Sequence, residues 1–366
     1  MLIKAAVTYE TGTPFEIKDV TLSEPKESEV LVKMAGCGIC HNDLFIKDNG
    51  GVPLPVVLGH EGSGVVVKTG HAVKKVKPGD HIVFCSYACY ECEQCLKGHP
   101  AACEKSYPVN FGGAYADGTK RLKDAEGREL SCFFSQSSFA TYAIGDEKNA
   151  VKVDAGVPLE MLGPLGCGIQ TGAGSVINRL KPSPGDSIAV FGCGSVGLSA
   201  IMAARLSGCS KIIGIDTLPE RLELALELGA THVINGEKTP DLVKEVISIT
   251  GKGADFSFDT TAVPELINAA LFCLKRRGVC GVVGSAGNDT MISIKYQPAL
   301  MSASRTLTGI VQGDSRPDLF IPQLIEFYKS GLFPFDRLIT YYDFKDINKA
   351  AEDSHSGKAV KPVLKY

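Results

Sequence analysis

The spacing of apolar and polar residues changes along this chain. From residue 1 to about residue 161, short runs rich in β-branched residues are separated by turns rich in Gly, Pro and Asp; examples are Glu29–Met34, Ser63–Val67 and His81–Phe84. β-branched residues fit a pleated, half-buried surface, and Gly and Pro end such runs. This part of the sequence predicts a mostly β domain.

From about residue 162 to residue 301, apolar strands alternate with amphipathic helices. The predicted strands are Ser187–Phe191, Lys211–Ile215, His232–Ile234, Asp255–Phe258 and Gly278–Val283. The predicted helices are Ser195–Leu206, Pro219–Leu228, Pro240–Ile249 and Val263–Leu274. Such alternation is typical of a parallel sheet covered by helices on both faces.

The alternation ends near residue 301, and we expect residues 302–366 to return to the first domain and complete it. With 366 residues, the chain is longer than one hydrophobic core usually supports. The predicted organisation is a β domain over 1–161, an α/β domain over 162–301 and a C-terminal segment over 302–366. The fold class is α/β.

Charge and hydropathy exclude some classes of partner. The formal net charge of -3 provides no basic field for nucleic acid or an anionic membrane surface. Met1–Ala6 carries no signal-peptide pattern, and the most apolar stretch, Ser187–Leu206, is interrupted by three glycines. We therefore expect a cytoplasmic protein with reduced cysteines.

Four cysteines form the most specific local motif. They follow the spacing C-x2-C-x2-C-x7-C and are Cys89, Cys92, Cys95 and Cys103. This spacing lets four thiolates converge on one zinc ion, and a closed four-cysteine site is structural because it has no open position. Two disulfides are the alternative, which the odd total of thirteen cysteines and the length of the chain disfavour. We expect a zinc-stabilised lobe at about residues 85–110.

A glycine turn between a predicted strand and helix indicates a dinucleotide site. The motif is G-C-G-S-V-G, with glycines Gly192, Gly194 and Gly197. The glycines allow a tight turn and close approach of a pyrophosphate to the helix N-terminus. Asp216 ends the next predicted strand, where its carboxylate suits the ribose hydroxyls of NAD and repels the 2′-phosphate of NADP. Arg221 is a candidate for the adenosine side, and the alternative is a plain glycine turn with a surface aspartate.

A second metal site is suggested by scattered residues. Cys40, His60 and Cys167 supply two thiolates and one imidazole, a set that leaves an open fourth position on zinc. Spacing alone does not link the three. Taken singly, each also fits a buried structural residue.

These motifs together resemble the zinc-dependent medium-chain alcohol dehydrogenases over nearly the whole chain. The resemblance rests on G-H-E-G-S-G at Gly59–Gly64, the four-cysteine cluster, Cys167, the glycine turn and Asp216. A closer resemblance is to the bacterial benzyl (aryl) alcohol and geraniol dehydrogenases. Its motifs are F-F-S-Q-S-S-F-A at Phe133–Ala140, G-P-L-G-C-G-I-Q-T-G at Gly163–Gly172, F-I-P at Phe320–Pro322 and F-P-F-D at Phe333–Asp336.

The resemblance implies a GroES-like β domain beside a Rossmann domain, with an active site between them. It implies that Cys40, His60 and Cys167 hold catalytic zinc, with Glu61 just behind the metal. Asp43 is expected to accept the second ring N–H of His60, although an aspartate that starts a helix is the alternative. Other expected contacts are Thr171 and Val196 to the nicotinamide, and His41 and Lys361, unless they are surface charges, to the pyrophosphate.

Zinc chemistry gives these expectations a mechanism. An alkoxide donates hydride more readily than an alcohol does, and zinc lowers the pKa of a bound hydroxyl. Asn42 departs from the family, because Ser or Thr usually stands there and an amide does not readily relay a proton. We expect protons to leave through water, assisted by His41. Phe45 stands where some members have a relay histidine, and Phe45 and Cys85 are candidate walls of the substrate pocket.

The sequence thus predicts an NAD-dependent zinc enzyme that interconverts a primary, aromatic or allylic alcohol and its aldehyde. The alternatives are a glutathione-dependent formaldehyde dehydrogenase-type enzyme and a non-catalytic protein that binds zinc and NAD as a sensor. Relatives of this kind are dimers or tetramers, and a tetramer is favoured. The candidate interfaces are Val279–Val283 and Met301–Val311.

Overall fold

The computed structural model describes residues 1–287 and 289–366. Contacts within the chain divide it into two compact units. Unit 1 comprises Met1–Gly168, Arg316–Ile325 and Asp336–Tyr366, and unit 2 comprises Ile169–Ser315 and Glu326–Phe335. The functional domain limits at residues 161 and 301 stay a prediction. Packing assigns Cys167 to unit 1, whereas the sequence placed it at the opening of the nucleotide domain.

Unit 1 contains two β-sheets. One has the order β4-β1-β2-β7-β8. Its strands are β1 (Leu2–Thr8), β2 (Glu16–Leu22), β4 (Val56–Val57), β7 (Leu122–Lys123) and β8 (Glu129–Leu130). The other has the order β10-β6-β5-β3-β18-β17, with β9 also paired to β3. Its strands are β3 (Glu29–Gly38), β5 (Glu61–Thr69), β6 (His81–Phe84), β9 (Tyr142–Asp146), β10 (Ala150–Val153), β17 (Ile339–Asp343) and β18 (Lys361–Lys365).

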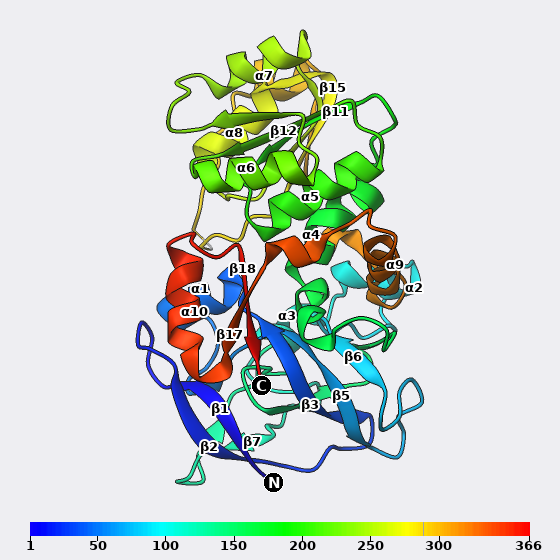
Figure 1. Cartoon of the computed structure of the whole chain (residues 1–366), viewed down its shortest axis with the longest axis vertical. Helices are drawn as coiled ribbons and strands as arrows, with labels where there is room; N and C mark the ends of the chain where they lie inside the picture. The colour runs from blue at the N-terminus through cyan, green and yellow to red at the C-terminus, as the bar shows by residue number, and fades with distance from the viewer. Residues whose placement is uncertain (288) are drawn as a thin grey trace. The chain divides into compact units, whose positions relative to one another are not determined.

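The C-terminal strand of unit 1 lies beside a strand from near the start of the chain. In Figure 1, red β18 runs next to blue β3, and the register pairs Val363 with Gly38. On the other side of β3, Gly38 pairs with Glu61 of β5. The end of β3, the start of β5 and the start of β18 therefore meet at one point. Residues 316–325 and 336–366 pack within unit 1.

Helices of unit 1 are short and mostly follow strands. They are α1 (His41–Asn49), α2 (Glu93–Leu96), α3 (Ser106–Phe111) and α10 (Ile347–His355). α10 contacts β18 and α1. α4 (Gly168–Gly174) and α9 (Pro317–Lys329) each have residues in both units. The short 3-10 helices of unit 1 are Pro100–Ala102, Leu159–Met161, Gly163–Gly166 and Phe344–Asp346, and Phe335–Leu338 begins with the last residue of unit 2. Unit 2 contains the 3-10 helix Gln312–Asp314 and the π-helices Ser175–Leu180 and Gln297–Met301.

Unit 2 is built on a parallel sheet of six strands in the order β13-β12-β11-β14-β15-β16. The strands are β11 (Ser187–Phe191), β12 (Lys211–Asp216), β13 (His232–Asn235), β14 (Ala254–Asp259), β15 (Leu274–Val282) and β16 (Thr306–Gly309). The helices are α5 (Ser195–Leu206), α6 (Pro219–Leu228), α7 (Leu242–Thr250) and α8 (Pro264–Phe272). Figure 1 draws α5 and α6 in front of β11 and β12.

The order of the strands explains where the helices lie. The chain moves one way from β11 through α5 to β12, and the other way from β14 through α8 to β15. Right-handed crossovers in opposite directions place their helices on opposite faces of the sheet. The predicted doubly wound parallel sheet is confirmed. β16 pairs with β15, and residues 302–315 pack within unit 2.

Within residues 1–287 and 289–366, no helix has both the length and the apolar character needed to cross a membrane.

Candidate active site

Side chains of four predicted site residues converge in unit 1. One ligand atom from each of Cys40, His60, Glu61 and Cys167 lies within 4.8 Å of the others. Cys40 caps the N-terminus of α1, His60 and Glu61 stand at the start of β5, and Cys167 follows a 3-10 helix. The structure thus brings together the residues that spacing alone did not link.

Two glycines make this close approach possible. A Cβ atom on Gly38 would lie 2.1 Å from Glu61 Oε2, and one on Gly163 would lie 2.0 Å from the carbonyl oxygen of Glu61. Real Cβ atoms do not come so close, so a side chain at Gly163 would push the 3-10 helix away from β5, and one at Gly38 would displace the carboxylate of Glu61. Both glycines are therefore required by packing around Glu61.

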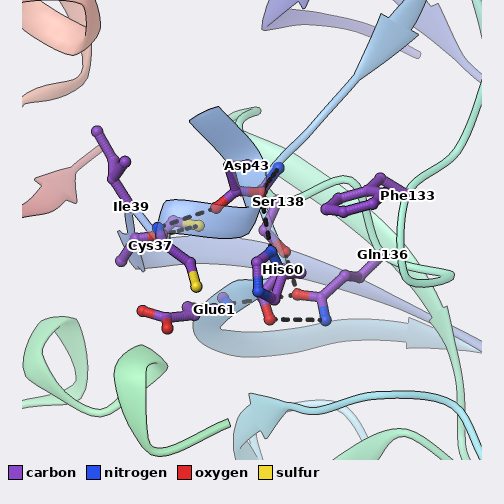
Figure 2. Close-up of polar contacts among 12 residues, drawn as sticks. Cys37, Ile39, Asp43, His60, Glu61, Phe133, Gln136 and Ser138 are labelled. Atoms are coloured by element: carbon purple, nitrogen blue, oxygen red, sulfur yellow. Dashed lines mark hydrogen bonds and ion pairs between the residues drawn. The ribbon is translucent and has the colours of Figure 1, made fainter. Parts of the chain in front are cut away.

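The imidazole of His60 is hydrogen-bonded through one of its two nitrogen atoms (Figure 2). Its Nδ1 lies 2.8 Å from Asp43 Oδ1, and both side chains are fully buried. Nε2 is buried and has no hydrogen-bond partner within residues 1–287 and 289–366. Because an Nδ1–H that donates to Asp43 leaves a lone pair on Nε2, this nitrogen is available to a metal.

Asp43 also organises the backbone around the cluster. Oδ1 accepts the N–H of Gly59 at 3.0 Å, and Oδ2 accepts the N–H of Cys40 at 3.0 Å. Asp43 is the third residue of α1, so it satisfies a backbone donor at the helix start as well as the imidazole. The two interpretations weighed from the sequence thus describe one side chain with both roles.

Glu61 is paired with Lys361, which comes from β18 (Figure 2 shows Glu61). Lys361 Nζ lies 3.0 and 2.9 Å from the two carboxylate oxygens of Glu61 and 3.1 Å from the carbonyl oxygen of Ile39. The three N–H groups of the ammonium are therefore all used inside unit 1, and Lys361 is 2% exposed. The pyrophosphate contact of Lys361 stays a prediction, and it requires one of these bonds to be exchanged.

Burial and neighbouring groups shift the pKa values of all four residues in this cluster. Loss of solvent raises the pKa of Glu61 to about 7, although the charge of Lys361 opposes the shift. A hydrogen bond from Cys167 holds the pKa of Cys40 well below its usual range, against the effect of burial. Two thiols, of which one ionises readily, and an imidazole with a free lone pair are a donor set that zinc prefers.

The four cysteines of the C-x2-C-x2-C-x7-C motif also converge. Their sulfur atoms lie within 4.8 Å of one another, in a lobe that includes α2. Cys89 Sγ accepts the N–H of Cys92 at 3.3 Å, and Cys103 Sγ accepts the N–H of Cys89 at 3.2 Å. No disulfide links the thirteen cysteines, all of which lie in the described ranges. A structural zinc therefore fits this set better than the disulfide alternative.

Sequence reasoning missed the role of the segment Phe133–Phe139. Its Gln136 is 1% exposed and donates to the carbonyl oxygen of His60 at 3.1 Å. The ring of Phe134 stacks on the imidazole of His60, with centroids 4.5 Å apart. The available signal was a single amide side chain between the aromatic residues of F-F-S-Q-S-S-F-A, because a polar side chain buried with such neighbours must find partners inside the protein.

The glycine turn of unit 2 has the geometry that close phosphate approach requires. Gly192 has φ of +90°, which favours glycine, and a Cβ on Gly197 would lie 1.8 Å from the carbonyl oxygen of Gly192. α5 begins directly after Gly194, so its N-terminal N–H groups face this turn. A Cβ on Gly172 would lie 2.0 Å from the carbonyl oxygen of Val196, which places Thr171 next to the same helix end.

Asp216 is held by backbone donors at the end of β12. Its Oδ2 accepts the N–H of Cys193 at 2.7 Å, and its Oδ1 accepts those of Thr217 and Leu218 at 2.8 and 3.0 Å. Arg221 Nη1 lies 3.9 Å from Oδ2. The carboxylate is thus fixed in place, and its remaining lone pairs suit ribose hydroxyls.

The remaining predicted residues lie in unit 1. His41 is the first residue of α1 and is exposed, and Asn42 beside it is half-buried. Phe45 packs partly buried against the core of unit 1, and Cys85 is fully buried.

A cysteine and histidine cluster in a β domain, together with a dinucleotide turn in a doubly wound domain, defines an oxidoreductase that uses zinc and NAD. The comparisons with known proteins agree. Residues 26–155 match the alcohol dehydrogenase GroES-like domain, and residues 195–330 match the zinc-binding dehydrogenase domain. The chain belongs to the family of zinc-dependent medium-chain alcohol dehydrogenases, whose reaction is NAD-dependent oxidoreduction of an alcohol.

Three relatives illustrate this membership. Geraniol dehydrogenase of Castellaniella defragrans is 46% identical over 99% of this chain and 97% of its own length. The crystal structure of benzyl alcohol dehydrogenase from Acinetobacter calcoaceticus matches with a TM-score of 0.96 and 44% identity, over 100% of this chain and 99% of that one. S-(hydroxymethyl)glutathione dehydrogenase of Paracoccus denitrificans is 34% identical over the full length of both chains, 100% of each.

Proposed function

We propose that this enzyme interconverts a primary aromatic or allylic alcohol and its aldehyde, with catalytic zinc held by Cys40, His60 and Cys167. One observation carries the proposal: His60 Nε2, which has no hydrogen-bond partner among the described residues, lies in a cluster with the thiols of Cys40 and Cys167. The benzyl and geraniol substrates named for two relatives, one aromatic and one allylic, support this substrate class.

Zinc bound at this cluster would supply Lewis acidity, which lowers the pKa of an alcohol hydroxyl and polarises an aldehyde carbonyl. The residues of the chain do the rest. Asp43 keeps the proton of His60 on Nδ1 and so fixes the ring. Glu61, paired with Lys361, stands behind the thiols as a nearby carboxylate and is not a resting ligand in this proposal. Cys89, Cys92, Cys95 and Cys103 hold the structural zinc.

NAD is assigned to the residues of the glycine turn and its neighbours. Gly192, Gly194 and Gly197 admit the pyrophosphate, and Asp216 binds the adenosine ribose. Thr171 and Val196 flank the nicotinamide, Arg221 lies on the adenosine side and His41 reaches the pyrophosphate. Lys361 does so only if it exchanges one of its bonds to Glu61 or Ile39. The proton leaves through water near Asn42, with help from His41.

A glutathione adduct of formaldehyde is the second candidate substrate. It is favoured by one observation, the 34% identity to S-(hydroxymethyl)glutathione dehydrogenase. Such an adduct carries carboxylates, so its oxidation would depend on glutathione and on cationic side chains. The third candidate, a sensor without turnover, predicts NAD binding with no reduced cofactor formed. One assay, the formation of reduced cofactor with different substrates, distinguishes both alternatives from the main proposal.

The test mixes purified protein with NAD and benzyl alcohol, cinnamyl alcohol, geraniol, ethanol or formaldehyde plus glutathione, and follows the absorbance of reduced cofactor. Zinc per chain is measured in parallel on wild type, Cys40→Ser and the control Cys209→Ser, whose thiol lies in unit 2. The proposal expects two zincs in wild type, and one zinc and no turnover in folded Cys40→Ser. An inactive wild type, or a Cys40→Ser variant that keeps both zincs, contradicts it.

We further propose a homo-oligomer, a tetramer rather than a dimer, in the cytoplasm, with no nucleic-acid or membrane partner. The edge strand β16 and the neighbouring β15 are the candidate interface, as the sequence suggested for Val279–Val283 and Met301–Val311. Light scattering on the purified chain tests the oligomer. A monomer contradicts it.

A further inference from the structure

The carbonyl group of His60 lies one residue before the start of β5. The pairing of β5 with β3 ends at Glu61, which pairs with Gly38. His60 is the next residue outward, so the ladder with β3 does not hold its carbonyl oxygen. The carbonyl oxygen of His60 therefore needs a hydrogen-bond donor from outside this ladder, if the backbone is to hold the imidazole in a fixed direction.

Gln136 supplies that partner (Figure 2). Its Nε2 donates to the carbonyl oxygens of His60 at 3.1 Å and Cys85 at 3.3 Å. Its Oε1 accepts the N–H of Gly62 at 3.3 Å and the hydroxyl of Ser138 at 2.7 Å. The amide thus bonds on both sides of Glu61, to the residue before it and the residue after it.

The orientation of this amide is fixed by its partners. If the oxygen and nitrogen were exchanged, an oxygen would face the carbonyl groups of His60 and Cys85, and an NH2 group would face the N–H of Gly62. Both arrangements are repulsive, so only one orientation satisfies the buried groups. Gln136 is 1% exposed, and water cannot replace these bonds without entering the core.

The loop that carries Gln136 also contacts the ring of His60. Phe134 stacks on the imidazole at a centroid distance of 4.5 Å, and Phe133 meets it edge-on at 5.4 Å. Phe134, Ser135 and Ser137 have φ of 53°, 50° and 52°, a region that residues other than glycine rarely adopt. Backbone strain of this kind persists only where the surroundings impose it, and it clusters at functional sites.

We propose that Gln136 is a positioning residue for His60. It extends the hydrogen bonding of β5 by one residue and so fixes the direction in which Nε2 points, while Asp43 fixes the rotation of the ring. This inference rests on the proposed function, in which Nε2 binds zinc. In this proposal Gln136 acts on the metal through the backbone of His60 and Gly62 and takes no direct part in the chemistry.

The experiment compares Gln136→Met, which removes all four hydrogen bonds at similar volume, with Gln136→Glu, which keeps an acceptor for Gly62. The matched control is Asn348→Leu, because the amide of Asn348 also bonds both backbone groups of one residue, Phe15, at 2.9 Å. Two readouts report on the metal itself: the rate at which zinc passes to a coloured chelator, and the visible spectrum after replacement of zinc by cobalt.

Gln136→Met is expected to release its catalytic zinc about 10- to 100-fold faster than wild type and to change the cobalt spectrum, the range typical of groups that orient metal ligands. The Glu variant keeps the acceptor for Gly62 but turns an oxygen towards the carbonyl groups of His60 and Cys85, so it should release zinc at least as fast as the Met variant. It gives the answer if the Met variant does not fold. Asn348→Leu should lower thermal stability and leave both metal readouts unchanged.

The proposal is overturned if either folded Gln136 variant loses stability as the control does, with zinc release and cobalt spectrum as in wild type. Failure of the proposed function looks different. In that case wild type itself holds no zinc that depends on Cys40, and the comparison of variants then also overturns the positioning role.

Discussion

Asp43 accepts the Nδ1–H of His60 at 2.8 Å, with both side chains fully buried. The same carboxylate accepts the backbone N–H groups of Gly59 and Cys40. Gly59 directly precedes the proposed zinc ligand His60, and Cys40 is itself a proposed ligand. One buried carboxylate therefore sets the tautomer of the imidazole and holds the backbone at the start of α1 and just before β5.

Asp43→Asn is expected to weaken zinc binding at the catalytic site by about 10- to 100-fold. An amide has one acceptor oxygen, so its NH2 group must face either the N–H of Cys40 or the imidazole and Gly59. Zinc affinity measured by competition with a chelator checks this. Asp353→Asn is the control, because Asp353 is buried and accepts the hydroxyl of Tyr342 at 2.8 Å. Equal zinc affinity in wild type and Asp43→Asn contradicts the prediction.

Lys361→Met is expected to lower the free energy of unfolding by about 3–5 kcal/mol, because Glu61 is left buried without its partner. The double variant Glu61→Gln with Lys361→Met should recover part of the loss, since neither charge remains. Denaturant unfolding measures both. For comparison, Lys68→Met breaks an exposed pair with Glu24 and should cost less than about 1 kcal/mol.

The same Lys361→Met variant tests the pyrophosphate role. Because all three ammonium N–H groups already have acceptors in unit 1, we expect the Kd of NAD to change little. Titration of the folded variant with NAD measures this Kd. A Kd raised about tenfold or more, at constant fold, would mean that Lys361 leaves Glu61 to bind the cofactor.

Asn42→Thr is expected to speed alcohol oxidation and to shift its pH profile. A hydroxyl both donates and accepts, so it restores a proton relay that an amide does not provide. The gain should not exceed the roughly 100- to 10,000-fold that one positioned proton-transfer group supplies. Single-turnover rates across pH measure it, with Asn49→Thr at the other end of α1 as control. Unchanged rates and an unchanged profile would remove any special role for Asn42.

Asp216→Asn is expected to raise the KM for NAD by about 10- to 100-fold, since a hydrogen bond to a charged group is worth about 1.5–3 kcal/mol. The KM for NADP should fall, because the repulsive charge is gone while Arg221 remains nearby. Asp186→Asn is the control, as Asp186 only accepts the N–H of Ser183 in a turn. A ratio of the two KM values that does not move contradicts the assignment of Asp216.

Local patterns in the sequence predicted much of this molecule, and long-range contacts were the part they missed. β6, β11, α5 and α6 begin and end where the periodicity placed them. The four cysteines lie within one short segment, so spacing sufficed. Gln136 and His60 are 76 residues apart, and Lys361 and Glu61 are 300 apart. Their pairing depends on how β5, β18 and a strained loop pack, which no local pattern encodes.

Asp117 gives unit 1 a stability that depends on pH. Burial opposes its ionisation, but hydrogen bonds from Lys26, Thr119 and Arg121 outweigh that effect and hold the pKa of Asp117 below its usual value. A carboxyl whose pKa is depressed by folding stabilises the fold above its unfolded pKa of about 3.9, and the contribution is lost as pH falls further. Asp117→Asn should therefore lower Tm at pH 7, with a smaller difference from wild type near pH 3. Thermal melts across this range measure it, and Asp343→Asn, in an exposed pair with Lys345, should change little at either pH. A difference between wild type and Asp117→Asn that stays constant from pH 7 to pH 3 would mean that the ionised carboxylate contributes nothing through its charge.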